Sequence, residues 1–452
     1  MSVSRRSVLG GLFAGAALPA STLATPAKAG INIDGFKGAI NATDLDAVPD
    51  LGADQTDVLQ RAIDVANRVG NPLFLPPGRY VASGLNLPSG THIVGVPGAS
   101  RLIYPGRSGL LIAENAEDIS LTSLVIEGHG SVLPNGFGLV TLVNTKGVTI
   151  DGCRIIGAAG NGLQLDGISG RVINTEISHC SEAAIFSTNA KGLRISGNTV
   201  TDCANNGILV WRSIKGDDGT IVTENRIERI GAANGGEGQW GNGVNIYRAD
   251  SVTVANNRIK DCAYSAVRSN AGSACQVLGN NCDRIGEVAI YAEFGYEGAV
   301  IANNILDQVA TGISMTNFST GGRLSVCTGN IVRNLFTRDH YDKRGVGIAA
   351  EADTVITGNV VENAPTAGIV IGWGPHLRDV SATGNVIRDA TIGIGVSVAE
   401  GAGSAVIADN LVSGTRSGAI VGMAWDEIVA RDLASVAADR FPQLQVGRNR
   451  VS

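Results

Sequence analysis

The stretch Ile195-Ser196-Gly197-Asn198-Thr199-Val200 decides the fold, because its pattern returns along the chain. The pattern is an apolar residue, two small or polar residues, asparagine, any residue, and then valine or isoleucine. Successive copies are between 23 residues (Asn257 to Asn280) and 32 residues (Asn225 to Asn257) apart. The same asparagine occurs at Asn198, Asn225, Asn257, Asn280, Asn304, Asn330, Asn359, Asn385 and Asn410, and Thr175 and Cys153 hold the position in two earlier copies.

A second signature follows each asparagine after a variable gap: glycine or alanine, then apolar, any, apolar. Examples are Gly207-Ile208-Leu209-Val210 and Gly368-Ile369-Val370-Ile371. Each repeat therefore has room for two or three short alternating strands and no helix-length apolar pattern. Repeats of this length indicate one solenoid turn per copy. The sequence predicts an all-β fold, a right-handed parallel β-helix.

The asparagine has a physical reason to recur. Turns of a coiled sheet stack at a strand spacing of about 4.8 Å, so equivalent residues form columns. An asparagine at a tight bend can hydrogen-bond to the neighbouring turns and to backbone groups that no regular strand satisfies. We therefore interpret this column as architectural and assign it no chemistry.

The first residues carry an export pattern. Ser4-Arg5-Arg6-Ser7-Val8-Leu9 opens a mildly apolar run, and Ala27-Lys28-Ala29 offers a small-residue cleavage site before Gly30. This pattern is typical of a twin-arginine signal peptide, here residues 1–29. We expect a periplasmic or secreted protein that is recognised by the twin-arginine translocation machinery and has no membrane anchor.

The remaining chain divides into an N-terminal segment, a long coil and a C-terminal segment. In residues 30–80, apolar residues at helical spacing predict a helix from Asp54 to Gly70, followed by the strand and turn of Phe74-Leu75-Pro76-Pro77-Gly78-Arg79-Tyr80. Residues 81–423 are the expected β-helix. In residues 424–452, a helical pattern over residues 425–441 precedes a last copy of the asparagine signature at Asn449. We expect a helical cap at each end.

The repeats, the helix before the "FLPPGRY" strand and the export signal together resemble the twin-arginine-translocated repetitive protein family of the pectate-lyase-like β-helix superfamily. That superfamily includes polysaccharide lyases, uronate epimerases, glycoside hydrolases and phage tailspikes. The resemblance implies the fold and leaves the reaction open among these classes.

Composition agrees with a thin-walled coil. Glycine accounts for 61 of 452 residues, aromatic residues for 4% and charged residues for 17%. The net charge of −6 gives no basic footprint for nucleic acid. It also gives no general attraction for an acidic polymer, so such a ligand needs a local basic site.

Seven cysteines lie beyond the signal peptide. Cys180, Cys203 and Cys262 each follow the ladder position by five residues, which suggests stacking inside the coil. Cys180 and Cys203 fall on adjacent turns, and a disulfide between them stays open.

Strand alternation separates the second signature into inward and outward residues. The inward residues are mostly apolar, and the outward residues of the middle turns include a group of aromatic, charged and amide side chains, whereas later turns carry Gly372, Gly395 and Ser397. This group consists of Trp211, Asn245, Tyr247, Arg268, Asn270, Tyr291, Glu293 and Glu351.

The longest insertions fall on the same turns. They span residues 231–242, 336–346 and 212–218, and insertions on a solenoid often form the walls of a binding face. We predict a groove for an extended polysaccharide over the outward residues, with aromatic rings on sugar faces and polar groups on hydroxyls and carboxylates. Further predicted substrate contacts are Arg212, Trp240, Arg248, Asn317 and Lys343.

Three functions fit these residues, and the mixture of tyrosine, arginine, histidine and glutamate side chains favours an enzyme, first of all a lyase or C5-epimerase. A lyase or C5-epimerase acting on a uronic-acid polysaccharide must neutralise the substrate carboxylate, remove the neighbouring proton and supply a proton. Arg268 suits the first role, with Arg248 as a second candidate. Tyr291 or Tyr247 could be base or acid, with His340 as partner.

The second function is inverting hydrolysis, which needs two carboxyl groups about 6.5–9.5 Å apart. Glu293 and Glu351 fall two turns apart in one column, roughly 9.6 Å. The third is a non-catalytic glycan-binding or cell-envelope structural protein. Calcium stays possible, because Asp217 and Asp218 form a paired-carboxylate loop near the predicted groove.

Overall fold

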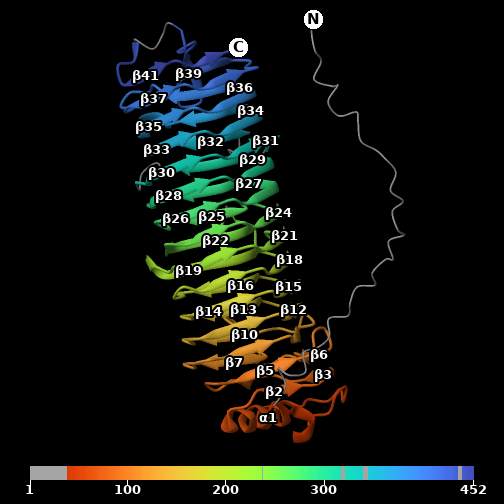
Figure 1. Ribbon diagram of the computed structural model, residues 1–452. Coiled ribbons are helices and arrows are strands. Elements are labelled where there is room, and N and C mark those ends of the chain that lie inside the picture. The colour runs from red at the N-terminus through yellow and green to blue at the C-terminus, as the bar shows by residue number, and fades with distance from the viewer. Residues whose placement is uncertain (1–37, 237, 317–320, 339–344, 436–439) are drawn as a thin grey trace, which may run out of the picture. The chain divides into compact units, whose positions relative to one another are not determined.

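The computed structural model describes residues 38–236, 238–316, 321–338, 345–435 and 440–452. The predicted signal peptide, residues 1–29, lies outside the described residues. From Gly38 onward the chain winds into a stack of turns, each made of three strands on three faces, which we name A, B and C in chain order (Figure 1). Every strand pairing among the described residues is parallel except that of β39 with β40.

Face A is a sheet of 16 strands. They are β1 (Ile40–Asn41), β2 (Leu73–Leu75), β5 (His92–Gly95), β8 (Ser120–Thr122), β11 (Val148–Asp151), β14 (Gly170–Ile173), β17 (Arg194–Ser196), β20 (Ile221–Thr223), β23 (Thr253–Ala255), β26 (Cys275–Leu278), β28 (Glu297–Ala302), β30 (Arg323–Thr328), β33 (Ala352–Thr357), β35 (Arg378–Thr383), β37 (Ala405–Ala408) and β41 (Leu444–Gly447).

Face B follows the corner that the ladder occupies from Cys153 onward. Its strands are β3 (Gly78–Val81), β6 (Ser100–Ile103), β9 (Val125–Glu127), β12 (Arg154–Ile156), β15 (Glu176–Ser178), β18 (Thr199–Cys203), β21 (Arg226–Ile230), β24 (Arg258–Cys262), β27 (Asn281–Glu293), β29 (Ile305–Thr316), β31 (Ile331–Arg333), β34 (Val360–Ile371), β36 (Val386–Ser397), β38 (Leu411–Ser413) and β42 (Arg450–Val451).

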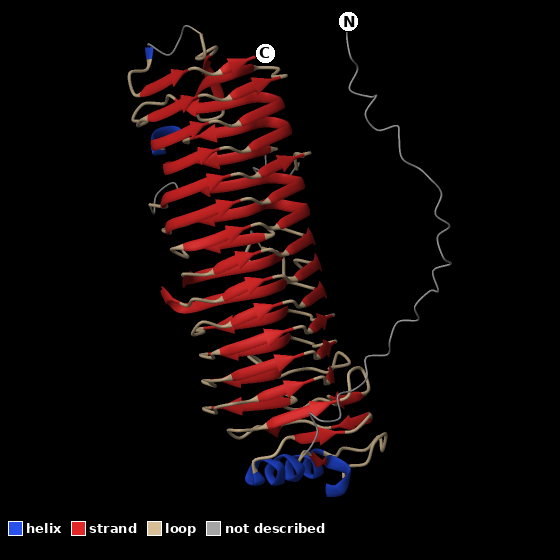
Figure 2. Ribbon diagram, in the orientation of Figure 1, coloured by secondary structure: helices blue, strands red, loops and turns tan. Residues whose placement is uncertain are grey.

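Face C completes each turn. Its strands are β4 (Leu85–Asn86), β7 (Leu111–Glu114), β10 (Gly138–Val143), β13 (Asn161–Asp166), β16 (Ala183–Thr188), β19 (Asn206–Asp217), β22 (Asn242–Asp250), β25 (Val267–Asn270), β32 (Val346–Ala350), β39 (Gly418–Ala424) and β40 (Glu427–Ala430). The long strands β27, β29, β34 and β36 run round the corner from face B to face C (Figure 2).

An asparagine ladder holds the corner between faces A and B. The residue before each asparagine has a left-handed backbone, as at Gly197 (φ 68°) and Glu224 (φ 59°), which turns the chain sharply. Asn198 Nδ2 then donates to Asn225 Oδ1 (2.9 Å) and to the carbonyl of Val172 (2.9 Å). The same bonds repeat on every turn to Asn449. The predicted column is confirmed.

The two substitutes for asparagine also occupy the ladder. The Thr175 amide donates to Asn198 Oδ1 (2.9 Å), and the Cys153 amide donates to Thr175 Oγ1 (3.3 Å). The inward residues predicted from strand alternation are buried in one continuous aliphatic core. They include Leu163, Ile185, Ile208, Val244, Val267, Ile290, Ile313 and Ile348.

The first turn carries the helix that the sequence predicts. A short 3-10 helix, η2 (Ala42–Leu45), precedes α1 (Thr56–Val69), which ends at Gly70 in a left-handed conformation (φ 73°). Helix α1 buries Leu59, Ala62, Ile63 and Ala66 in the core of the coil. Its position at the β2 end is clear in Figure 1, and its protective role as a cap stays a prediction.

The predicted helix over residues 425–441 is wrong for its described part. After β39 the chain reverses at Trp425 (φ 56°), and β40 pairs with β39 in an antiparallel hairpin, with Ile428 opposite Met423. The Trp425 ring packs edge-on against Trp373, with centroids 5.6 Å apart. Strand pairing and this aromatic contact outweigh the helical spacing. A 3-10 helix, η3 (Gly374–His376), lies beside the hairpin tip, since Gly374 packs against the Trp425 ring.

All seven cysteines are free and buried. Cys180 and Cys203 therefore form no disulfide in this structure. Burial raises the pKa of the Cys282 thiol to about 12 and that of Cys153 to about 11, so these thiols stay protonated at neutral pH.

Among the described residues, no helix combines the length and the apolar character needed to cross a membrane.

The ladder predicts a specific loss of stability. Asn280→Ala removes the donors to Val254 O (3.0 Å) and Asn304 Oδ1 (3.0 Å) and the acceptor of the Asn257 amide (3.0 Å). Because buried groups left without partners cost about 1–3 kcal/mol each, we expect the free energy of unfolding to fall by roughly 3 kcal/mol or more. Urea unfolding followed by circular dichroism measures this change.

Asn281→Ala is the matched control, because Asn281 is the next residue and its side chain is exposed on face B. We expect little change for this variant. Equal losses for the two variants would show that the ladder bonds do not stabilise the coil.

Candidate functional site

The outward columns of face C have the predicted register. Asn245, Arg268 and Tyr291 are neighbours in one column, and Tyr247, Asn270 and Glu293 are neighbours in the next. The columns extend to Leu209 and Trp211 on one side and to Ser314 and Thr316 on the other. The prediction of which residues share a column is confirmed.

Aromatic side chains form one end of this outward surface of face C. The Trp211 ring lies 5.1 Å from Phe186 and 5.3 Å from Tyr247 between centroids, and the Arg248 guanidinium lies 4.8 Å from the Tyr247 centroid. These aromatic rings are half-buried. The Trp211 indole Nε1 is buried without a hydrogen-bond partner among the described residues. The column thus offers partly exposed ring surface on neighbouring turns.

Arg268 lies in a buried ionic cluster. Its Nε and Nη2 donate to the two carboxylate oxygens of Glu293 (2.6 and 3.0 Å), and its Nη1 donates to Glu287 (3.2 Å). Asn270 also donates to Glu293 (3.1 Å), and the guanidinium stacks 5.1 Å from the Tyr291 ring centroid. Burial raises the pKa of Glu293, and the charge of Arg268 opposes that shift.

Gly238, in the insertion at residues 231–241, lies directly against this cluster. A Cβ at Gly238 would overlap the Arg268 guanidinium, so only glycine fits there. The side chains of Asn245 and Asn206 both donate to the Gln239 carbonyl (3.2 Å each). Asn245 is therefore buried and holds the insertion in place, although the sequence predicted it as a substrate contact.

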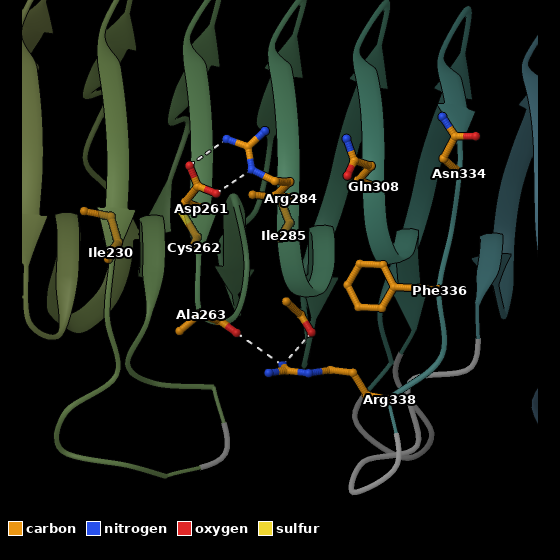
Figure 3. Close-up of a pocket in the computed structure, with 11 residues that line it drawn as sticks. Ile230, Asp261, Cys262, Ala263, Arg284, Ile285, Gln308, Asn334, Phe336 and Arg338 are labelled. Carbon is orange, nitrogen blue, oxygen red and sulfur yellow. Dashed lines mark hydrogen bonds and ion pairs between the residues drawn. The ribbon is translucent and has the colours of Figure 1, made fainter.

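A pocket lies at the corner between faces B and C, where Phe336 and Arg338 of one long insertion form part of its lining. We call it the corner pocket; its volume is about 570 Å³, and it extends from Ile230 at the end of β21 to the segment after Asn334 (Figure 3). It is lined by Ile230, Asp261, Cys262, Ala263, Arg284, Ile285, Gly286, Gln308, Asn334, Phe336 and Arg338. The predicted groove was placed over face C; the pocket instead opens at its edge.

Charged groups in the corner pocket differ in their pairing. Arg284 binds Asp261 through two bonds (2.6 and 2.7 Å), and this bonding lowers the pKa of Asp261. Arg338 Nη1 donates to the carbonyls of Ala263 (3.3 Å) and Gly286 (2.5 Å). Within the described ranges, no carboxylate lies at ion-pair distance from Arg338. Figure 3 shows the Arg338 side chain reaching from its insertion towards Ala263.

The sequence analysis missed the pocket residues, although a signal exists. Asp261, Arg284, Gln308 and Asn334 each follow a ladder asparagine by four residues and share a left-handed backbone. They therefore form an outward column at the corner. Phe336 and Arg338 follow in the long insertion after this column. Counting from the ladder would have found the column.

The other predicted residues are dispersed. Trp240 is half-buried, and Arg212 Nε donates to the Ile214 carbonyl (3.2 Å) within a bulge of β19. Glu351 is buried and lies two turns beyond Glu293, as predicted. His340, Lys343 and Asn317 lie outside the described residues.

The predicted acidic pair does not form a joint site. Asp217 is exposed, whereas Asp218 is buried and its Oδ1 accepts the Thr220 amide (3.2 Å). In the part of the chain that the structure describes, no three side chains of His, Cys, Asp or Glu gather as a metal site would require.

Solved structures share the fold at low identity. The bacteriophage phi29 gene product 12 N-terminal fragment is 13% identical, with 86% of this chain and 69% of that chain covered and a TM-score of 0.55. The catalytic unit of the GH87 α-1,3-glucanase from Streptomyces thermodiastaticus is 16% identical (91% and 68% covered, TM-score 0.49). The mannuronan C-5 epimerase AlgE4 A-module from Azotobacter vinelandii is 15% identical (78% and 96% covered, TM-score 0.46). These likenesses concern the fold alone.

No curated protein matches the chain. A family model described as the right handed beta helix region matches residues 99–215 and 213–385, which is more than half of the sequence. The chain therefore belongs to the family of the right handed beta helix region.

Proposed function

We propose that the protein binds an acidic polysaccharide at the corner pocket. The observation that carries the proposal is the pocket itself, which combines the Phe336 ring, the amides of Gln308 and Asn334, and the Arg338 guanidinium. An aromatic ring with a few polar groups is the usual lining of a sugar site. A volume of about 570 Å³ has room for a short oligosaccharide.

The charges of the pocket favour an acidic glycan. Arg284 is paired with both Asp261 and Asp283, whereas Arg338 meets no carboxylate among the described residues, so Arg338 is the cation that the pocket offers to a ligand carboxylate in a chain of net charge −6. Because the whole protein repels acidic polymers, a local cation is needed to hold one. Arg338 supports this role, since its known bonds go to neutral carbonyls.

Export belongs to the same proposal. The pattern around Arg5 and Arg6 supports delivery by the twin-arginine machinery, so that the pocket would meet its polymer in the periplasm or outside the cell. The twin-arginine repetitive family resembled by the sequence stays a hypothesis consistent with this role.

Uronate elimination or C5-epimerisation is the second candidate function. It is favoured by the cluster of Arg268, Tyr291, Glu287 and Glu293, because carboxyl groups with a raised pKa gather at catalytic sites. Arg268, however, already gives three donors to two carboxylates under the 231–241 insertion. A substrate carboxylate would have to displace one of them, so we rank binding first.

Inverting hydrolysis has less support. Glu293 would have to act as one of two independent carboxyl groups, but both of its oxygens accept bonds from Arg268. The other neighbour, Asn270, adds a third bond to Glu293.

The binding proposal predicts the effect of two substitutions. Arg338→Gln removes the cation and Phe336→Ala removes the ring, so each should weaken binding to polygalacturonate or alginate by about 10-fold, the equivalent of one charge-assisted hydrogen bond. Isothermal titration calorimetry with oligosaccharides of each polymer measures the change. Binding to dextran should be weak and unaffected by Arg338→Gln.

Arg194→Gln is the control, because Arg194 is an exposed arginine of β17 on face A, away from the corner pocket. Its affinity should equal that of the unsubstituted protein. Equal losses for Arg194→Gln and Arg338→Gln, or no binding to any acidic polysaccharide, would contradict the proposal.

A second prediction separates structure from catalysis at Arg268. Arg268→Gln leaves two buried carboxylates without their cation, so we expect a loss of about 3–5 kcal/mol in the free energy of unfolding near pH 8. Burial already raises the pKa of Glu293, and losing Arg268 raises it further. The folded variant then keeps a proton on Glu293 that the unfolded chain releases. Its loss of unfolding free energy relative to the unsubstituted protein should therefore become smaller as the pH falls towards about 5.

Arg229→Gln is the matched control, since Arg229 makes a similar two-bond pair with Asp202 at the surface. We expect little change, because solvent screens that pair. Absorbance of unsaturated uronides would be followed in parallel. An Arg268→Gln protein as stable as the unsubstituted one but without uronate turnover would favour the catalytic candidate.

A further inference from the structure

Face B carries an apolar column in its C-terminal half. The residue after each ladder asparagine points outward, and these residues are in register from turn to turn. On earlier turns they are polar or charged: Thr199, Arg226, Arg258 and Asn281. On five consecutive later turns they are Ile305, Ile331, Val360, Val386 and Leu411. Four of these five side chains are 37–41% exposed.

A column of alternating charge runs beside it, two residues further along each strand. Its members are Asp307, Arg333, Glu362 and Arg388, in register on the same turns. Arg333 Nη2 lies 2.8 Å from Asp307, and Arg388 Nη1 lies 3.7 Å from Glu362. Both arginines are about half exposed, with 48% and 58% of their side chains accessible.

The order of these charges makes the face complementary to itself. Two copies can be related by a two-fold axis that runs parallel to the strands of face B, midway between β31 and β34. This rotation reverses the order of the turns in the second copy, and each column of one copy then lies opposite the same column of the other. Arg333 then faces Glu362 of the second copy, and Asp307 faces Arg388 of the second copy. Ile331 faces Val360, and Ile305 faces Val386, so the apolar column also meets itself.

The other two-fold arrangement lacks this match. A half turn about an axis along the coil keeps the order of the turns. An axis through the charged column then brings like charges together, and an axis through the apolar column leaves the charged column without opposite charges across the contact. Isologous contacts through one self-complementary patch are the commonest way in which identical chains associate. Opposite charges in register favour one partner and one orientation.

We propose that the C-terminal half of face B binds a second copy of this chain in this antiparallel arrangement. The residues that meet their own column across this axis, from Ile305 to Val386, span four turns, about 14 Å at the usual strand spacing, and Leu411 faces Asn281 of the second copy at each edge. Such a contact is at the small end of interface sizes, so the dimer is weak and concentration-dependent. The proposal is independent of the proposed polysaccharide function.

Sedimentation equilibrium of the full chain, from about 1 to 200 µM, tests the proposal over the range expected for a small interface. A dimer should appear as the concentration rises. Glu362→Arg places like charges opposite Arg333 on both sides of the axis and should raise the dissociation constant at least about 10-fold. Glu228→Arg, in the same column of β21 but outside the patch, should leave it unchanged.

A charge-swapped chain provides the sharpest test. The combination Asp307→Arg, Arg333→Glu, Glu362→Arg and Arg388→Glu preserves the alternation, so this variant should dimerise with itself. Mixed with the unsubstituted chain it brings like charges together, so few mixed dimers should form. A monomer at every concentration, a dimer insensitive to Glu362→Arg, or mixed dimers as abundant as the pure ones would overturn the proposal.

Discussion

The asparagine ladder is the interaction on which the rest of the structure depends. A coil must bend sharply three times per turn, and a sharp bend interrupts the strand ladder and leaves buried backbone groups without partners. At the corner between faces A and B, each asparagine supplies one acceptor and two donors to its neighbours above and below. Along the ladder, these bonds therefore fix the distance and the rotation between one turn and the next.

That lock has a consequence for the surface. Since the turns cannot slip against one another, residues at the same distance from the asparagine form straight columns on the outside. One residue after the ladder gives the apolar column of face B, and four residues after it gives the polar column of the corner pocket. Both surfaces for which we propose a partner are therefore defined by such columns, and an insertion contributes Phe336 and Arg338 to one of them.

The sequence predicted the features that follow from this periodicity. The ladder, the inward and outward columns and the α1 helix could be found because each depends on local spacing, as Asn198, Ile208 and Leu59 illustrate. What covers an outward residue does not follow from spacing. Arg268 is outward in the sheet, yet the 231–241 insertion and two glutamates enclose it, so its exposure could not be predicted.

Two other differences between the prediction and the structure also arise from contacts between residues that are distant in sequence. The segment after Ala424 has helical spacing, but a neighbouring strand and the Trp373 ring hold it as a hairpin, and neither partner is local in sequence. The corner pocket depends on residues about a hundred positions apart in sequence, from Ile230 to Arg338, that the coil brings within a few turns. Long-range contacts of this kind need the three-dimensional arrangement.

Hydrogen–deuterium exchange with and without a uronate oligosaccharide tests the central claim, the location of the polysaccharide site, most directly. The account predicts that slowed exchange is centred on the corner pocket, at the backbone near Ala263 and Gly286 and in the segment from Asn334 to Arg338. Slowed exchange confined to the outward strands of face C around Tyr247, with none at the corner, would contradict it.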